Sequence, residues 1–246
     1  MSFAPTKAFL LAAGQGTRLR PLTDTTPKCL LPIGGVPMLQ IWLSRCEAFG
    51  IREVLINLHA HSDVVRDFVR RNAVPDVRVM VSDEPVLLGS AGTIRENRKW
   101  VRDQAAFWVF YADVLTHANL EQMASFHARR DAAATIGLYR VPDPARCGIV
   151  QVDDSGWVTE FIEKPKMPVG NLAFSGILLG GPEFLDALPT TTPSDIGFHV
   201  LPQLVGRMLG YEIREYLIDI GTMENYQAAQ KDWSAMQPAC QQERHA

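Results

Sequence analysis

The segment LLAAGQGTRLRPL, residues 10–22, joins an apolar run to a loop rich in glycine and arginine. The apolar run predicts a buried strand, and open α/β sheets bind their ligands at the carboxyl ends of such strands. Gly14 and Gly16 allow the backbone to approach a ligand closely and to expose its N–H groups. Thr17 adds a hydroxyl group, and Arg18 adds a planar set of donors that matches phosphate oxygens. The segment therefore predicts a strand followed by an anion-binding loop.

Two common phosphate-binding patterns do not describe this loop. The G-x-G-x-x-G pattern of dinucleotide-binding proteins requires a glycine where the sequence has Leu19. The Walker pattern requires Gly-Lys followed by Ser or Thr, and the sequence has no such run. A glycine turn with a solvated arginine is the alternative that needs no ligand. Lys28 favours a ligand, because the stretch PLTDTTPKCLLPIGGVPML (21–39) holds this lysine in a stiff loop interrupted by prolines.

The first half of the chain alternates between short apolar runs and segments with helical spacing. The alternation predicts a mostly parallel sheet with helices on both faces. We expect Ser62 to be the N-cap of the second helix. The expected strands cover 8–13, 53–57, 77–81 and 106–111, and the expected helices cover 37–50, 62–71 and 91–101.

After residue 130 the pattern changes to strands separated by turn residues. The sequence DDSG (153–156) predicts a hairpin turn between two of them. Helices are expected to resume near 182 and 198. No long linker rich in Gly, Ser or Pro separates the two halves, so we expect a β-rich lobe within the same domain. The further strands are expected at 133–141, 148–153, 157–164 and 173–180.

Composition excludes several classes of function. The net charge of −3 gives no electrostatic signal for nucleic-acid binding, and no apolar stretch approaches the length of a membrane span. The four cysteines, Cys29, Cys46, Cys147 and Cys240, do not have zinc-site spacing. They predict reduced thiols and a cytoplasmic location.

The Gly-x-Gly-Thr-Arg-Leu run and the later Pro-Lys resemble the signature of the sugar-phosphate nucleotidylyltransferases, also called sugar nucleotide pyrophosphorylases. Members of this family join a nucleoside triphosphate to a sugar 1-phosphate and release pyrophosphate. The resemblance extends from about residue 7 to 230, because further segments match in the family's order. These segments are LLGSAGTI (87–94), FWVFYADVLT (107–116), GIVQVDDSGWVTEFIEKP (148–165), FSGILLGGPEFLD (174–186) and YLIDIGTMENYQAA (216–229).

The resemblance implies a Rossmann-like three-layer α/β/α nucleotidyltransferase fold, with a mixed, mostly parallel sheet and a β-rich sugar-binding lobe. It implies one catalytic domain over residues 1–236, and we expect a flexible polar tail at 237–246. The oligomeric state stays open, with a homo-oligomer as one alternative.

The resemblance also implies roles for individual residues. Arg18 and Lys28 would neutralise the triphosphate as catalytic groups, with Lys28 at the α-phosphate, and Asp113 and Asp219 would hold Mg²⁺. Each aspartate has an alternative role as a helix N-cap, most seriously Asp219 ahead of GTMENY. The nucleotide-binding set is Ala13, Gly14, Gly16, Thr17, Gly89, Ser90 and Gly92, and the sugar-phosphate set is Gly148, Glu163, Lys164 and Ser175.

The substrate pair follows less directly from the sequence. LGSAG (88–92) resembles the Leu-Gly-Thr-Ala-Gly loop of guanylyltransferases for mannose 1-phosphate and heptose 1-phosphates, whereas FSGI (174–177) resembles uridylyltransferases for muramic-type sugars. We expect GTP with a manno-configured hexose or heptose 1-phosphate. The alternatives are a uridylyl- or thymidylyltransferase for a glucose or muramic-type sugar, and a non-catalytic sensor. A dinucleotide-dependent oxidoreductase is disfavoured by Leu19.

Departures from the family pattern concern mainly the sugar site. Cys147 stands where an aromatic residue often precedes the hairpin glycine, and Phe174–Gly176 stand where Asn-Ala-Gly is common. Cys29 follows the active lysine in place of proline, and Ala112 precedes the first metal aspartate in place of glycine. The departures at Cys147 and Phe174–Gly176 therefore bear on the identity of the sugar.

Overall fold

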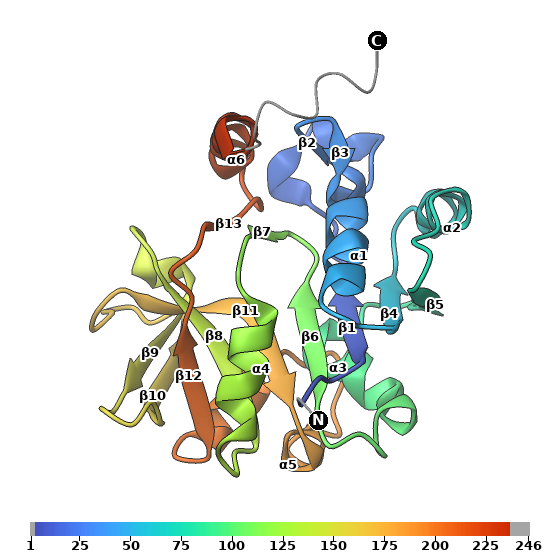
Figure 1. Ribbon diagram of the computed structural model, residues 1–246. Helices are drawn as coiled ribbons and strands as arrows, with labels where there is room; N and C mark the ends of the chain where they lie inside the picture. The colour runs from blue at the N-terminus through green and yellow to red at the C-terminus, as the bar shows by residue number, and fades with distance from the viewer. Residues whose placement is uncertain (1–2, 237–246) are drawn as a thin grey trace.

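The computed structural model describes residues 3–236, so the predicted tail at 237–246 and Cys240 lie outside the described residues. A central mixed sheet runs in the order β10-β9-β11-β6-β1-β4-β5, with β8 on β11 and β12 on β8 (Figure 1). Its strands are β1 (Lys7–Leu11), β4 (Glu53–Leu58), β5 (Arg78–Asp83), β6 (Phe107–Tyr111), β8 (Ala134–Arg140), β9 (Gly148–Val152), β10 (Val158–Glu163), β11 (Leu172–Gly180) and β12 (Met208–Glu212).

The sheet is parallel in the first half of the chain and mixed in the second. Strand β1 pairs in parallel with β4 and with β6, and β4 pairs in parallel with β5. Strand β11 then pairs antiparallel with β6, β8 and β9, while β12 is parallel to β8. The β9–β10 hairpin closes through the predicted turn, where Asp153 N donates to Trp157 O at 2.9 Å. The mixed sheet and the β-rich lobe are therefore as predicted.

Helices cover the two faces of the sheet. The helices are α1 (Met38–Ala48), α2 (Ser62–Arg71), α3 (Gly89–Glu96), α4 (Leu120–Ala128), α5 (Pro182–Asp186) and α6 (Met223–Met236). Two small ribbons, β2 (Pro32–Ile33) with β3 (Val36–Pro37) and β7 (Val114–Thr116) with β13 (Leu217–Asp219), complete the fold. Within residues 3–236, no helix combines the length and apolar character needed to cross a membrane.

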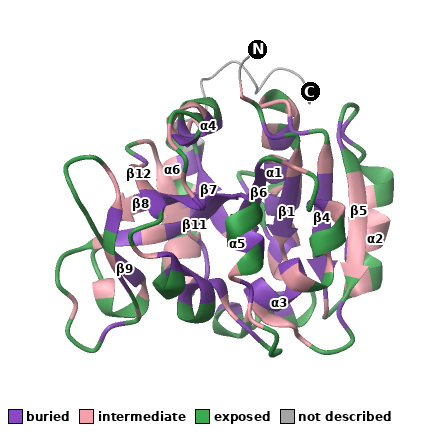
Figure 2. Ribbon diagram, turned by 90° about the horizontal axis from the view of Figure 1, so that it is seen from below, coloured by how far each residue is buried: buried purple, intermediate pink, exposed green. Residues whose placement is uncertain are grey.

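Alternation along β6 divides the core into two layers. Trp108 and Phe110 pack on one face of the sheet with Trp42 of α1, while Phe107 packs on the other face with Phe184 of α5. Successive side chains of a strand point to opposite faces, so a fully apolar strand indicates a sheet covered on both sides. Figure 2 shows the buried residues concentrated on the central strands and the exposed ones on the outer helices and loops.

Three local predictions require correction. The N-cap of α2 is His61, with φ 55°, and Ser62 is the first helical residue without a capping role. The helix expected over 91–101 instead begins at Gly89, ends at Glu96 and is followed by a 3₁₀ turn at Arg98–Trp100. The helix expected near 198 is a short π-helical turn, η6 (Ile196–Val200), capped by the Asp195 side chain.

Candidate active site

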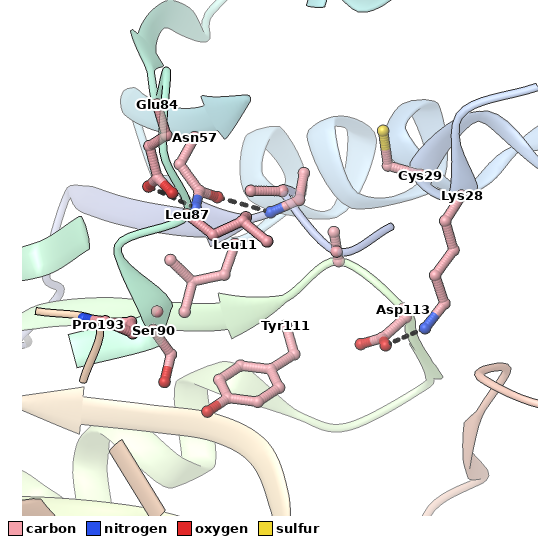
Figure 3. Close-up of a pocket in the computed structure, with 15 residues that line it drawn as sticks. Leu11, Lys28, Cys29, Asn57, Glu84, Leu87, Ser90, Tyr111, Asp113 and Pro193 are labelled. Carbon is pink, nitrogen blue, oxygen red and sulfur yellow. Dashed lines mark hydrogen bonds and ion pairs between the residues drawn. The ribbon is translucent and has the colours of Figure 1, made fainter. Parts of the chain in front are cut away.

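A cavity of about 480 Å³ opens at the carboxyl ends of β1, β4, β5 and β6 (Figure 3). Ligand sites are expected at this edge of an open α/β sheet. The predicted nucleotide residues Ala13, Gly14, Gly89 and Ser90 line the cavity, together with Lys28 and Asp113. Its other lining residues are Leu11, Ala12, Cys29, Asn57, Glu84, Leu87, Tyr111, Ala112 and Pro193.

The glycine loop folds back onto Lys28. Gly16 has φ +65°, and a Cβ at this position would lie 2.8 Å from Thr23 Cγ2 and 3.2 Å from Lys28 Cβ. The Thr23 hydroxyl donates to Gly16 O at 2.8 Å, which holds the loop in this shape. Glycine is therefore required by the left-handed backbone and by the close packing. Thr17 is exposed, as the first residue of a 3₁₀ turn.

Lys28 is paired with the first predicted metal ligand. Its Nζ forms an ion pair with Asp113 Oδ2, and Figure 3 shows the ends of the two side chains meeting at one side of the cavity. The Lys28 side chain is only 11% exposed, so its charge acts in a poorly hydrated environment. Asp113 directly follows Tyr111 and Ala112 at the end of β6 and precedes strand β7. It therefore has no helix to cap.

The ribbon formed by β7 and β13 brings the second aspartate to the first. Asp219 pairs with Val114, and Ile220 N donates to Asp113 O at 2.9 Å. Burial and the nearby Asp113 carboxylate raise the pKa of Asp219, while the charges of Lys28 and Arg18 act in the opposite direction. A buried carboxylate whose charge is disfavoured beside a second carboxylate provides a site for a cation.

Gly221 marks the point where the charged groups meet. A Cβ on this residue would lie 2.7 Å from Asp219 Oδ1, 2.9 Å from Arg18 Nη2 and 3.2 Å from Lys28 Nζ. The structure therefore brings together both predicted catalytic cations and the second predicted metal ligand. Arg18 forms no ion pair with any residue in the described range 3–236, and its guanidinium stays available to an anionic ligand.

The capping alternative for Asp219 is not what the structure shows. The side chain of Asp219 accepts from Gly221 N at 2.5 Å, before the helix begins. In the first turn of α6, Asn225 N instead donates to the Thr222 hydroxyl at 3.2 Å. The Asn225 side chain donates in turn to Asp219 O at 2.7 Å, which ties the aspartate backbone to the helix.

The two carboxylates suit a hard cation whose remaining ligands come from water and a substrate. Among residues 3–236, no group of three or more His, Cys, Asp or Glu side chains gathers as a metal cage. Mg²⁺ is usually held by one or two carboxylates, with water and substrate phosphates completing its shell. Asp113 and Asp219 therefore fit Mg²⁺ bound together with phosphate.

The loop before α3 is held in place by the backbone of Ser194, which comes from a distant segment of the chain. A Cβ on Gly89, which has φ +77°, would lie 2.2 Å from Ser194 O. That carbonyl accepts from Ala91 N at 3.0 Å and from Gly92 N at 3.3 Å. Gly92 packs against Leu88 and does not line the cavity, whereas Gly89 does.

Three of the four predicted sugar-phosphate residues lie together. A Cβ on Gly148 would lie 2.6 Å from Glu163 Oε2, and Lys164 Nζ lies 3.9 Å from Glu163 Oε1. Burial and the nearby Asp195 carboxylate raise the pKa of Glu163, and Lys164 lowers it. Ser175 is separate from this group, because it is buried with its Oγ 2.6 Å from where a Cβ on Gly137 would lie.

Sequence reasoning missed a buried polar network at the far wall of the cavity. Asn57 accepts from Ala12 N at 2.7 Å and donates to Glu84 Oε1 at 2.9 Å. Glu84, only 3% exposed, also accepts from the Thr93 hydroxyl and from Leu88 N at 3.1 Å. The available signal was the position of Asn57, which ends the strand expected at 53–57, whereas Glu84 lies beyond the strand expected at 77–81 and gave no such signal.

Known proteins resemble this chain over most of its length. The family model described as Nucleotidyl transferase matches residues 7–235. The chain is 31% identical over 226 residues to mannose-1-phosphate guanylyltransferase 1 of Arabidopsis thaliana and 32% identical over 223 residues to mannose-1-phosphate guanylyltransferase of Mycobacterium tuberculosis. Each alignment covers 89% of this chain and 62% of the relative, so the chain spans less than two thirds of these relatives' length.

Solved structures share the fold. HddC from Yersinia pseudotuberculosis complexed with GMP-PN superposes with a TM-score of 0.77 at 24% identity, covering 93% of this chain and 99% of that one. UDP-glucose pyrophosphorylase complexed with UDP-glucose superposes with a TM-score of 0.83 at 22% identity, covering 95% and 100%. The family match over nearly the whole described chain, together with this fold, establishes that the protein belongs to the nucleotidyl transferase family.

Proposed function

We propose that this protein transfers a nucleotidyl group from GTP to the 1-phosphate of a manno-configured hexose or heptose, releasing pyrophosphate. The convergence of Arg18, Lys28 and Asp219 around Gly221, beside Asp113, carries the proposal. Two anionic substrates repel each other, so the reaction needs positive charge and fixed positions more than covalent chemistry.

The residues have separate roles in an in-line displacement. An oxygen of the sugar phosphate attacks the α-phosphorus and forms the new P–O bond, while the bond to the pyrophosphate oxygen breaks. Lys28 lies at the cavity wall, where its ammonium group can bind the α-phosphate, and Arg18 can bind the outer phosphates. Both cations offset the charge that accumulates on the leaving pyrophosphate.

Asp113 and Asp219 would hold Mg²⁺. When bound, the ion supplies positive charge to the phosphates and orients them. The raised pKa of Asp219, which burial and Asp113 cause, supports a role for this carboxylate in binding a cation. The Lys28 ammonium group is paired with Asp113, beside the position proposed for the α-phosphate.

The buried carboxylate of Glu84 supports guanine as the base. Glu84 lines the cavity and accepts from Asn57, Thr93 and Leu88, which uses about three of the roughly four acceptor sites of a carboxylate. Guanine presents neighbouring N–H donors on its pairing edge, whereas uracil and thymine present a single N–H between two acceptors. The printed names of the guanylyltransferase relatives point to the same base and to mannose 1-phosphate.

The Glu163 and Lys164 pair supports the position of the sugar phosphate. Glu163 can accept from sugar hydroxyls, and Lys164, whose Nζ also lies 5.4 Å from the centroid of the Phe198 ring, can bind the phosphate. The described cysteines are free thiols, which supports a reducing compartment such as the cytoplasm as the location of the reaction.

The test is pyrophosphate release with Mg²⁺, crossing GTP, UTP, dTTP, ATP and CTP with a panel of sugar 1-phosphates. We expect GTP with mannose 1-phosphate or a heptose 1-phosphate to give the strongest signal. Asp113→Ala should abolish it, and Asp154→Ala, at the exposed hairpin turn, should not. A stronger signal with UTP or dTTP would overturn the assignment of the base. No release from any pair, with GTP still bound in calorimetry, would indicate a sensor.

A further inference from the structure

A short segment, residues 194–197, separates the loop before α3 from Glu163. We call it the linking segment. On the α3 side, Ser194 N donates to Leu88 O at 2.8 Å, and Ser194 O accepts from the first turn of α3. On the other side, a Cβ on Gly197 would lie 2.4 Å from Glu163 Oε2. The segment therefore touches both proposed substrate sites, although it was not among the residues that sequence patterns selected.

Asp195 is the charged side chain of this segment, and its hydrogen bonds run in two directions. Oδ2 accepts from the Ser90 hydroxyl at 2.8 Å, and the Ser90 oxygen accepts from Ile196 N at 2.8 Å. Oδ1 accepts from Gly197 N at 2.8 Å and from Phe198 N at 3.3 Å. One carboxylate therefore ties the cavity wall at Ser90 to the first turn of η6.

Glu163 is left without a hydrogen bond by this arrangement. Within residues 3–236 its carboxylate accepts none, and its charged neighbour Lys164 lies 3.9 Å away. The N–H groups of Gly197 and Phe198 would suit a carboxylate, because exposed N–H groups at the start of a helical turn attract anions. Asp195 already occupies them, and the oxygens of Glu163 stay free to accept from a ligand.

We propose that Asp195 is a positioning residue that couples the two substrate sites: it holds the cavity wall through Ser90 and, by occupying the N–H groups of η6, keeps Glu163 open to the sugar. The inference rests on the proposed function for the identity of the two ligands. It rests on the hydrogen bonds of Asp195 for the coupling itself. Gly197 is required for this arrangement, because any larger side chain would contact the Glu163 carboxylate.

Kinetics of three variants test the coupling. In Asp195→Ala the η6 N–H groups lose their acceptor, and Glu163 turns towards them. We expect KM for the sugar 1-phosphate to rise about tenfold, which corresponds to about 1.4 kcal/mol, and KM for GTP to rise several-fold, with kcat changing much less. In Asp195→Asn the amide oxygen can still accept from both N–H groups, and the amide NH2 can donate to the Ser90 oxygen with the direction of that hydrogen bond reversed, so both KM values should stay close to wild type. Asp186→Ala, at the exposed end of α5, is the matched control.

A double variant separates coupling from general damage. If Asp195 acts through Glu163, then adding Asp195→Ala to Glu163→Gln should leave KM for the sugar 1-phosphate at the value of Glu163→Gln alone. An equal fold-increase in both backgrounds would overturn the proposal, because Asp195 would then act independently of Glu163. Equal damage from Asp195→Asn and Asp195→Ala would also overturn it, since hydrogen-bond acceptance would not be the relevant property.

A crystal structure of unliganded Asp195→Ala tests the same inference without any substrate. We expect a Glu163 carboxylate oxygen within hydrogen-bond distance of Gly197 N or Phe198 N. Glu163 in its wild-type position would refute the positioning role, even with an active enzyme. If wild-type protein failed to release pyrophosphate while the variant structure showed the moved carboxylate, the proposed function would fail and the positioning role would stand.

Discussion

Adding a single methyl group at Gly221 should disturb the reaction without disturbing the fold. The added Cβ would lie 2.7 Å from Asp219 Oδ1 and 2.9 Å from Arg18 Nη2, well inside the ordinary contact distance of about 3.5 Å. Lys28 Nζ, at 3.2 Å, is also too close. Each of these atoms is at the end of a side chain, so all three can withdraw by several tenths of an ångström while the backbone stays in place.

The size of the effect follows from these displacements. Misplacement of reacting or positioning groups by about 1 Å costs around a hundredfold in rate, so Gly221→Ala should lower kcat roughly ten- to a hundredfold. The backbone at Gly221 is not in the left-handed region, so alanine is tolerated there. We expect the free energy of unfolding to change by less than about 0.5 kcal/mol, and Tm by less than about 2 °C.

The assay is continuous pyrophosphate release at saturating GTP and sugar 1-phosphate, repeated over a range of Mg²⁺ concentrations. Because Asp219 is among the displaced groups, the Mg²⁺ concentration for half-maximal rate should rise in Gly221→Ala. Gly181→Ala is the control, since its Cβ would lie 3.3 Å from Ala105 O, away from the charged cluster. A Gly221→Ala protein with wild-type kcat and wild-type Mg²⁺ dependence would refute the convergence of these groups on the reaction.

Three further predictions follow from the same contacts. Because the pKa of Asp219 is raised in the folded state, the protonated carboxyl stabilises the fold fully below the ordinary pKa of 3.8, and this contribution is lost as the pH rises through the raised pKa. Metal-free Asp219→Asn should therefore show a higher Tm than wild type at pH 7. The difference in Tm should vanish near pH 3. Glu84→Gln should lower the ratio of kcat/KM for GTP over UTP by about tenfold or more, because an acceptor facing guanine becomes a donor; an unchanged ratio would exclude Glu84 from base recognition. Gly89→Ala should lower Tm by roughly 5 °C, measured calorimetrically, because its Cβ would lie 2.2 Å from the Ser194 backbone, whereas Gly14→Ala, with open space around it, should not.

Much of the fold could be predicted from local sequence. The apolar runs before Gly14 and before Asp113 are strands β1 and β6, because a fully apolar run of this length buries both faces of a sheet. The hairpin at 153–156 was predicted from its turn residues alone. The exact start of α2 was not, because His61 takes a left-handed conformation that the preference for serine at N-caps does not reveal.

The candidate site was also predictable from the sequence only in part. Arg18, Lys28 and Asp113, like Asp219, were predicted from the sequence, because their motifs follow the order of the family that the chain resembles and their residue types suit phosphate chemistry. Their convergence with Asp219 depends on the pairing of β7 with β13, two segments that lie far apart in the chain. No local pattern specifies such a pairing. It depends on which apolar faces the whole chain buries.

The hydrogen-bond partners of Glu84 and Asp195 follow from the tertiary structure alone. In the sequence these two residues are an acid after a strand and an acid in a proline-containing loop, and neither position differs from a solvated surface carboxylate. Folding places them against N–H and O–H donors of other segments, at Leu88 and Thr93 for Glu84 and at Ser90 for Asp195. The sequence by itself therefore determined the strands, the glycine loop and the charged groups that phosphate chemistry requires. The tertiary structure decided which carboxylates share partners, because hydrogen bonds between distant segments exist only after the sheet has brought those segments together.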